Sequence, residues 1–459
     1  MKRILALLLA VLLIAGLAAC GGGTQAPAAT PAPPAGGEAG ETPAPPAAPA
    51  EREVIQFWNN AGDDVSNPLY QQLIDEFNAS QDRFYVEYTG IAFADFANRL
   101  TMAVATDTMP DVTILGFSSM IIYQEMGALI DLRDKFFAWE NHGEISPVLV
   151  DTSMELARGP LLGVPFAYNQ EVSWYYTPFF AEHNISPPAT QSEFLAMAEE
   201  FADPANDRYF FSLRAVRPYD NLVGWLFTYA DGAGFGGSYF DENNVSVINR
   251  PEFVAAMDAY ASLFWNGWVS GDSVNANFGE MVAEFGGGTS VYIMHNSSSV
   301  GQHRNNLGEG NFGVKQALMN EHGRFFTSGL QPNIYSIMNT RGQDGDYTGA
   351  WELIKFLSSA DAVGRVADTL GRVPVNQVAF DAPWAAQNEV LQLCLEIINN
   401  PNFIQIQNPY WLPDFQHWVN DIMTAGFQAV LLRDRTSQDV LDEWASLLTA
   451  WQAEWLGNQ

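Results

Sequence analysis

Hydrophobic and polar residues follow two different periods in the first part of the chain, and these periods predict strands and helices in turn. The segments 52–58, 83–90 and 110–116 are rich in β-branched and aromatic residues, which is typical of strands. Between them, 67–78 and 93–106 repeat apolar residues every three to four positions, which predicts amphipathic helices. Strands that alternate with helices of this length favour parallel pairing through right-handed crossovers.

The same alternation of strand and helix returns later in the chain, with clear signals at the helix ends. Asn67 is predicted to cap the first helix, and Thr190 with Glu193 has the spacing of a capping box. The segment 250–268 predicts a helix opened by proline, and 412–455 predicts mainly two amphipathic helices. The pattern therefore predicts an α/β fold with two lobes.

Composition narrows the classes of partner and of chemistry. The chain has 53 acidic residues against 21 Lys and Arg, and the net charge of −32 argues against nucleic acid and anionic membrane surfaces as partners. Its six histidines show no metal-ligand spacing, and no phosphate-binding glycine loop or nucleophile motif is present. We therefore expect no metal, no cofactor and no catalytic residues.

The amino terminus has the pattern of a lipoprotein signal. Two basic residues precede an apolar run from Ile4 to Leu17, which is too short to span a bilayer comfortably. The run ends in Leu17-Ala18-Ala19-Cys20, which resembles a bacterial lipobox and implies a signal peptide at 1–19 and acyl chains, such as palmitate, on Cys20. An ordinary signal peptide with a chance cysteine is the alternative. Residues 20–52 are rich in Pro, Ala and Gly and predict a disordered tether.

Several segments of the body, in one order, carry a resemblance to a known family. They are "VIQFWNNAGDD", "FANRLTMAVATDTMPDVTIL", "LLGVPFAY…VSWYYTPFFAEHNISPPATQSEF", "YDNLVGWLFTYADGAGF", "GGGTSVYIMHNSSSV" and "AWELIKFLSSADAVGRVADTLGRVPV". Together they resemble the extracellular solute-binding proteins of ABC importers, of the sugar-binding type related to maltose-binding protein. Thr106 and Asp107, Gln191, and Tyr292 to Met294 depart from the family pattern.

The resemblance implies a periplasmic-binding-protein-like fold, in which two α/β lobes hold a ligand in the cleft between them. Lobe 1 would comprise 53–166 and 330–370, and lobe 2 would comprise 167–329 and 371–459. The hinges would lie near Pro165, Gly329 and Gly371.

Candidate ligand contacts follow from position and from the resemblance. The carboxyl ends of the first and third strands are where open α/β sheets bind ligands, and the loops there contain Asn59, Asn60, Asp63, Asp64, Gly116 and Ser118. The resemblance adds Tyr168, Asn169, Tyr219, Trp225, His295, Asn296, Arg372 and Trp411. The alternatives are helix capping for the polar residues of the first loop, hinge structure for Tyr168 and Asn169, and core packing for the aromatic residues.

The resemblance implies a monomeric binding protein, lipid-anchored on the outer side of the cell membrane, that captures a mono- or oligosaccharide and delivers it to ABC permease subunits. A binder of a polyamine, a peptide or glycerol phosphate is one alternative, and a tethered glycan-degrading enzyme is another. Acidic sugars stay open as ligands through Arg372, Arg214 or Arg217.

Overall fold

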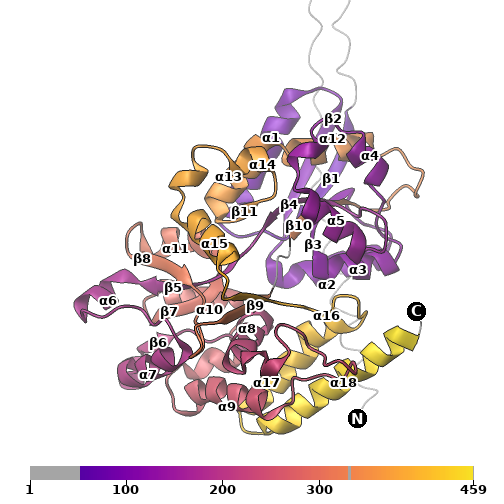
Figure 1. Cartoon of the computed structure of the whole chain (residues 1–459). Helices are drawn as coiled ribbons and strands as arrows, with labels where there is room; N and C mark the ends of the chain where they lie inside the picture. Colours follow the sequence, from indigo (N-terminus) through magenta and orange to yellow (C-terminus); the bar gives the residue numbers. More distant parts are fainter. Residues whose placement is uncertain (1–51, 329–331, 458–459) are drawn as a thin grey trace, which may run out of the picture. The chain divides into compact units, whose positions relative to one another are not determined.

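Two β-sheets organise the chain in the computed structural model, which describes residues 52–328 and 332–457 (Figure 1). The first sheet has the strand order β11-β4-β10-β3-β1-β2. Its strands are β1 (Glu53–Asn59), β2 (Phe84–Gly90), β3 (Val112–Gly116), β4 (Val164–Tyr168), β10 (Pro332–Ile337) and β11 (Val373–Pro374). The second sheet, in the order β6-β7-β5-β8, comprises β5 (Glu171–Tyr176), β6 (Tyr209–Phe211), β7 (Ser290–Asn296) and β8 (Phe312–Gln316). A parallel pair, β9 (Phe325–Ser328) and β12 (Phe403–Ile406), stands apart from both sheets.

Helices fill the connections between the strands. Those in the first third of the chain are α1 (Ser66–Ser80), α2 (Phe93–Ala105), α3 (Phe117–Glu125), α4 (Arg133–Phe137) and α5 (Pro147–Leu156). The middle of the chain has α6 (Thr177–Glu182), α7 (Gln191–Phe201), α8 (Tyr219–Tyr229), α9 (Pro251–Trp265), α10 (Phe278–Gly286) and α11 (Val300–Leu307). The remainder are α12 (Thr348–Leu357), α13 (Ala360–Leu370), α14 (Gln377–Phe380), α15 (Glu389–Asn399), α16 (Phe415–His417), α17 (Met423–Leu431) and α18 (Ser437–Gly457).

The predicted α/β class is confirmed, and so is parallel pairing among the first three strands. Strand β1 pairs in parallel with β2 and with β3. The sheet as a whole is mixed, however, because β10 enters between β3 and β4 and pairs with both in the antiparallel direction. No local pattern predicts this insertion, since β10 follows the second sheet in sequence.

The helix ends show one correct prediction and one error. Thr190 Oγ1 accepts the backbone N–H of Glu193 at 3.2 Å, and Glu193 Oε2 accepts the N–H of Thr190 at 3.2 Å, so the capping box is confirmed. The Asn67 cap is wrong, because α1 begins at Ser66. Asp63 Oδ1 accepts the backbone N–H groups of Val65 at 3.0 Å and Ser66 at 2.8 Å and replaces that cap.

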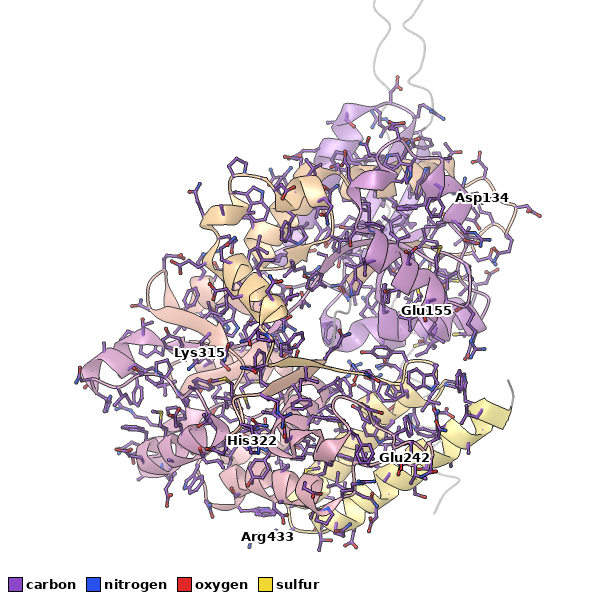
Figure 2. All side chains as sticks on the ribbon, in the orientation of Figure 1. Asp134, Glu155, Glu242, Lys315, His322 and Arg433 are labelled. Atoms are coloured by element: carbon purple, nitrogen blue, oxygen red, sulfur yellow. The ribbon has the colours of Figure 1, made fainter. Side chains whose placement is uncertain are left out.

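Buried apolar side chains pack the helices against each sheet. Around the second sheet, α9 buries Phe253, Met257 and Tyr260. The predicted C-terminal pair of helices is present as α17 and α18, which both contact α9. Lys315 on β8 (Figure 2) donates to the carbonyls of Pro187 at 3.0 Å and Pro188 at 2.6 Å, which fixes the loop before α7.

The capping box gives a stability prediction. Thr190→Ala leaves the Glu193 N–H without its acceptor and should lower the free energy of unfolding by about 1 kcal/mol. Thr190→Ser keeps a hydroxyl at the cap and is the matched control. Urea denaturation of the two variants measures the difference, and equal stabilities would contradict a role for the hydroxyl.

Candidate functional site

Five strands of the first sheet each have one end on the same side of that sheet. We call this row of strand ends the first edge. Gly116 at the end of β3 pairs with Asn333, and Tyr168 at the end of β4 pairs with Pro332 and Val373. Asn59 ends β1, which is parallel to β3. The first edge therefore joins the carboxyl ends of β1, β3 and β4 to the starts of β10 and β11, where open α/β sheets bind ligands.

The β1 loop divides into a residue at the edge and residues that serve α1. Asn59 is fully buried, its Oδ1 accepts the Ala61 N–H at 3.0 Å, and its Nδ2 has no partner of normal hydrogen-bond geometry. Asp63 caps α1, so its carboxylate already has a structural role. Asn60 is partly buried and Asp64 is exposed.

The other first-edge candidates fall on β3 and β4. The Gly116 carbonyl accepts the Ser119 hydroxyl at 3.1 Å, and the side chain of Ser118 lies outside the described residues. Tyr168 is buried, and Asn169 Oδ1 is a buried acceptor without a partner in the described part of the chain. The edge thus combines an apolar wall with unpaired polar atoms.

Arg372 lies just before β11 against an aromatic stack. Its guanidinium carbon lies 6.0 Å from the centre of the Phe166 ring, and Phe166 stacks on Tyr335 with ring centres 3.9 Å apart. The Tyr335 hydroxyl lies 3.4 Å from that of Tyr70. Burial raises the pKa of Tyr70, while Arg372 and hydrogen bonds from Tyr335, Asn59 and Arg372 oppose this rise. Arg372 and Asn59 therefore converge on one hydroxyl.

Gly371 explains how the backbone reaches this position. It ends α13 in the left-handed conformation with φ 59°, which glycine adopts without strain. A Cβ at this position would lie 2.3 Å from the carbonyl oxygen of Ser297, which follows β7. The close approach sets the segment that carries Arg372 directly against the end of the second sheet.

The second sheet ends in its own polar cluster, which we call the second edge. Glu171 at the start of β5 pairs with Asn296 at the end of β7. Arg214, which follows β6, is buried, and its Nη2 donates to Asn221 Oδ1 at 3.2 Å and lies 3.9 Å from Asp220 Oδ2. Asn221 in turn donates to the Met294 carbonyl.

The two carboxyl groups of the second edge have altered acidity. Burial and, to a smaller extent, Asp220 raise the pKa of Glu171 to about 8, although Arg214 and a hydrogen bond from Asn296 oppose the rise. Burial also raises the pKa of Asp220, against Arg214 and Arg217. Near neutral pH, Glu171 is therefore an acid that can donate or accept a hydrogen bond.

A small polar cavity of about 40 Å³ lies beside these residues. Its lining includes Glu171, Ser173, Gln191, Asp220 and Asn221. Ser173 Oγ and Gln191 Oε1 are buried without hydrogen-bond partners in the described part of the chain. A cavity of this size with unpaired polar atoms suits ordered water. Gln191 stands where the family pattern has tryptophan, and a tryptophan would need more of this space.

His295 and Asn296 lie at the second edge, and the side chain of His295 is buried. Its ring stacks on Phe278 with centres 4.5 Å apart, its Nδ1 has no partner within the described residues, and burial with Arg214 lowers its pKa. Asn296 Oδ1 accepts the Ser298 N–H at 3.1 Å.

The three remaining aromatic candidates all have packing or hydrogen-bond partners, and Trp225 also lines the small cavity beside the second edge. The Tyr219 hydroxyl contacts Asn408 and Tyr239 in the core. Trp225 is buried and donates to the Ala256 carbonyl at 2.9 Å. Trp411 donates to Gln452 Oε1 on α18 at 2.8 Å.

Sequence reasoning missed Asp220 and Asn221. The available signal was their position, because they open α8 shortly after β6 and so fall at the carboxyl end of a strand. Tyr219 in the same turn attracted the prediction because aromatic rings stack on sugars, but the polar residues beside it form the edge.

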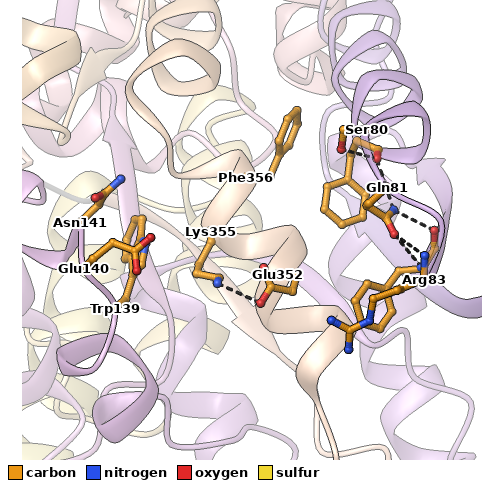
Figure 3. Close-up of a pocket in the computed structure, with 11 residues that line it drawn as sticks. Ser80, Gln81, Arg83, Trp139, Glu140, Asn141, Glu352, Lys355 and Phe356 are labelled. Atoms are coloured by element: carbon orange, nitrogen blue, oxygen red, sulfur yellow. Dashed lines mark hydrogen bonds and ion pairs between the residues drawn. The ribbon is translucent and has the colours of Figure 1, made fainter.

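A larger cavity of about 380 Å³ opens far from both edges (Figure 3). It lies beside the start of β2, the end of α1 and α12, and it is lined by residues such as Gln81, Phe84, Trp139 and Lys355. Lys355 forms an ion pair with Glu352 at 2.9 Å. Because this is the amino end of β2, the cavity is at the opposite end of the strands from the first edge.

Two further observations concern metal binding and membrane spans. Across residues 52–328 and 332–457, no group of three or more His, Cys, Asp or Glu side chains could hold a metal ion. Within the same ranges no helix combines the length and hydropathy that a membrane span requires.

Comparisons with known proteins agree with this architecture. The model of the family described as bacterial extracellular solute-binding protein matches residues 72–392. A putative binding protein of Brucella abortus is 19% identical over 390 residues, which cover 83% of this chain and 89% of that protein. An ABC transporter solute-binding protein from Thermotoga lettingae, bound with α-D-tagatose, superimposes with a TM-score of 0.75 at 17% identity and covers 87% of this chain and 100% of its own. Maltose-bound MalE3 of T. maritima gives a TM-score of 0.72 at 20% identity, with 86% and 99% covered.

The acidity of Glu171 gives a pH prediction. The folded chain holds this proton up to about pH 8, whereas the unfolded chain releases it near pH 4.5. The contribution of Glu171 to stability is therefore complete below about pH 4.5 and is lost as the pH rises through about 8. Glu171→Gln, which imitates the protonated acid, should lose less free energy of unfolding than the wild type between about pH 5 and pH 8.

Glu155→Gln, on the exposed face of α5 (Figure 2), is the matched control and should follow the wild-type pH profile. Urea denaturation at each pH measures the profiles. Identical profiles for Glu171→Gln and the wild type would show that Glu171 does not retain its proton.

Proposed function

The chain belongs to the family of bacterial extracellular solute-binding proteins, and we propose that it captures a carbohydrate outside the membrane and delivers it to the permease of an ABC transporter. We infer the class of ligand from the side chains that lie at the two edges. The first edge sets unpaired atoms of Asn59 and Arg372 beside the ring of Phe166. The second edge contains the unpaired Nε of Arg214 and the unpaired Nδ1 of His295, whose ring stacks on Phe278.

This composition suits a sugar. Hydroxyl groups need paired donors and acceptors, and the apolar faces of sugar rings lie against aromatic side chains. The tagatose-bound and maltose-bound proteins that share the fold support the same ligand class. A polyamine, a peptide or glycerol phosphate is the alternative within the family.

We further propose that the ligand lies between two lobes, each built on one sheet. The sequence placed the boundaries at 166, 329 and 370, but Ala167 and Tyr168 pair in the first sheet, and so do Val373 and Pro374. We therefore move the two outer boundaries to the end of β4 and the end of β11. A ligand that contacts both edges would favour the closed arrangement by its extra affinity for that state.

Binding without turnover is part of the proposal. Two pairs of acidic residues, Asp63 with Asp64 and Glu280 with Glu284, could imitate the carboxylate pair of a glycosidase, but members of both pairs have other contacts. Asp63 caps α1, Glu280 completes the capping box of α10, and Glu284 accepts the Ser212 hydroxyl. The family match and both structural relatives are binding proteins, which supports a binder over a tethered glycan-degrading enzyme.

The membrane anchor and the monomeric state also belong to the proposal. Cys20 and the tether lie outside the described residues, and their roles rest on the lipobox pattern. Two acyl chains anchor a protein stably where one alone binds marginally. The family is extracellular, so the anchored protein would face the outside of the cell.

A thermal-shift screen tests the ligand class. A sugar present at 100 times its dissociation constant should add about 2.7 kcal/mol to the free energy of unfolding and raise the melting temperature. The panel contains mono- and oligosaccharides, polyols, polyamines and peptides, and the sugars should remain chemically unchanged. Stabilisation by a polyamine and by no sugar would contradict the proposal, and hydrolysis of a glycan would support the enzyme.

Cell fractionation tests the anchor. Cys20→Ala removes the sulfur that would carry the lipid, so the variant should leave the membrane fraction while its sugar binding stays unchanged. Ser80→Ala, in the folded body, is the control and should remain in the membrane fraction. Membrane retention of Cys20→Ala would refute the lipid anchor.

A further inference from the structure

Arg372 is a partly buried cation without a carboxylate partner among the described residues. The chain has 53 acidic residues and only 21 basic ones, so an arginine can readily find a partner. Arg341 pairs with Glu53 and Asp111, and Arg365 pairs with Glu76. No described carboxylate forms an ion pair with Arg372, and its Nε and Nη1 are buried without an acceptor in the described part of the chain.

The unpaired groups around Arg372 are mainly donors. Asn59 Nδ2 carries hydrogen atoms and has no partner of normal geometry, and it lies at the same Tyr70 hydroxyl as the guanidinium. The neighbouring Tyr88 hydroxyl is buried and unpaired as well. Three groups that can donate hydrogen bonds thus meet at the first edge, and together they call for a ligand rich in acceptors.

Asp63 is the acidic residue near these three donor groups, but it does not neutralise the charge of Arg372. Burial raises the pKa of the Tyr88 hydroxyl, and Tyr70 and Asp63 raise it as well, so Asp63 lies close enough to act on Tyr88. Its Oδ1 is occupied by the N–H groups at the start of α1. A buried charge that lacks a partner is costly, and the Phe166 ring beneath the guanidinium offsets only part of this cost. An anion at the first edge would offset more.

We propose that the first edge binds the carboxylate of an acidic carbohydrate, such as a uronic acid, with Arg372 supplying the charge and Asn59 a further N–H. This inference rests on the proposed function and specifies its substrate class. A guanidinium matches a carboxylate in shape and charge. The hydroxyl groups of the same sugar would bind Glu171 and Asp220 at the second edge.

A carboxylate fits this edge better than a phosphate. A sugar phosphate carries close to two negative charges, and Arg372 is the one cation that the described residues place in this donor cluster. The next arginine, Arg214, is already engaged with Asp220 and Asn221. A singly charged ligand therefore balances the cluster without leaving a negative charge unpaired.

Calorimetric titration of the purified full-length chain tests the proposal with matched sugars. D-Glucuronate and D-galacturonate are compared with D-glucose and D-galactose, and digalacturonate and glucose 6-phosphate extend the series. At least one uronate should bind at least about tenfold more tightly than its neutral counterpart. Tighter binding of a neutral sugar, or of glucose 6-phosphate, would overturn the proposal.

Variants assign the effect to the residue. Arg372→Met keeps the apolar stem and should weaken uronate binding by about 10- to 100-fold, because a charge-assisted hydrogen bond is lost. It should weaken binding of the neutral sugar by a clearly smaller factor, because a hydroxyl group carries no charge. Arg372→Lys keeps the charge and should retain part of the uronate preference. Arg83→Met, at the opposite end of the strands, is the matched control and should change neither affinity.

The outcomes separate this inference from the proposed function. If neutral sugars bind and no uronate binds more tightly, the chain is a sugar-binding protein and the inference fails. If no carbohydrate of either kind binds, the proposed function fails with it. An equal loss of uronate and neutral-sugar binding in Arg372→Met would make Arg372 a structural residue and overturn the assignment.

Discussion

The pairing of β10 with both β3 and β4 is the contact on which the arrangement of the two edges depends. Because β10 follows the second sheet, the chain must leave the first sheet after Tyr168 and return to it at Pro332, and these two residues pair with each other. Exit and return therefore occur at the same end of the strands. Glu171, where the second sheet starts, follows Tyr168 by only a few residues. Polar groups of both sheets are therefore close in sequence to the point where the chain passes from one sheet to the other.

Local patterns predicted the elements of the fold well and their assembly less well. The Thr190 capping box, the first three strands and the C-terminal helices depend on residues a few positions apart, and these predictions are confirmed. The antiparallel strand β10 and the short strand β11 depend on pairing across long stretches of chain, which periodicity does not encode. The Asn67 cap failed because the helix begins before Asn67, next to the N–H groups of Val65 and Ser66 that Asp63 accepts.

The candidate site shows the same division. Position at a strand end selected Asn59, while the resemblance selected Tyr168 and Asn296, and these residues lie at the two edges. The resemblance also selected Tyr219, Trp225 and Trp411 as aromatic residues that could stack on a sugar, and their side chains contact partners distant in sequence, such as Asn408 and Gln452. An aromatic residue serves the core and a sugar equally well, so its type alone does not distinguish the two. A polar residue at a strand end has fewer structural uses and is the better guide.

The insertion of β10 also has a kinetic consequence. Strand β3 is an apolar segment, and β10 covers its open side. That cover arrives only when the chain has been completed from residue 116 to residue 332. Until then the growing chain presents an unpaired apolar strand, which is a template for association with other chains. Pairings between residues so far apart in sequence also slow folding. Release of the first half of the chain alone would therefore expose that strand.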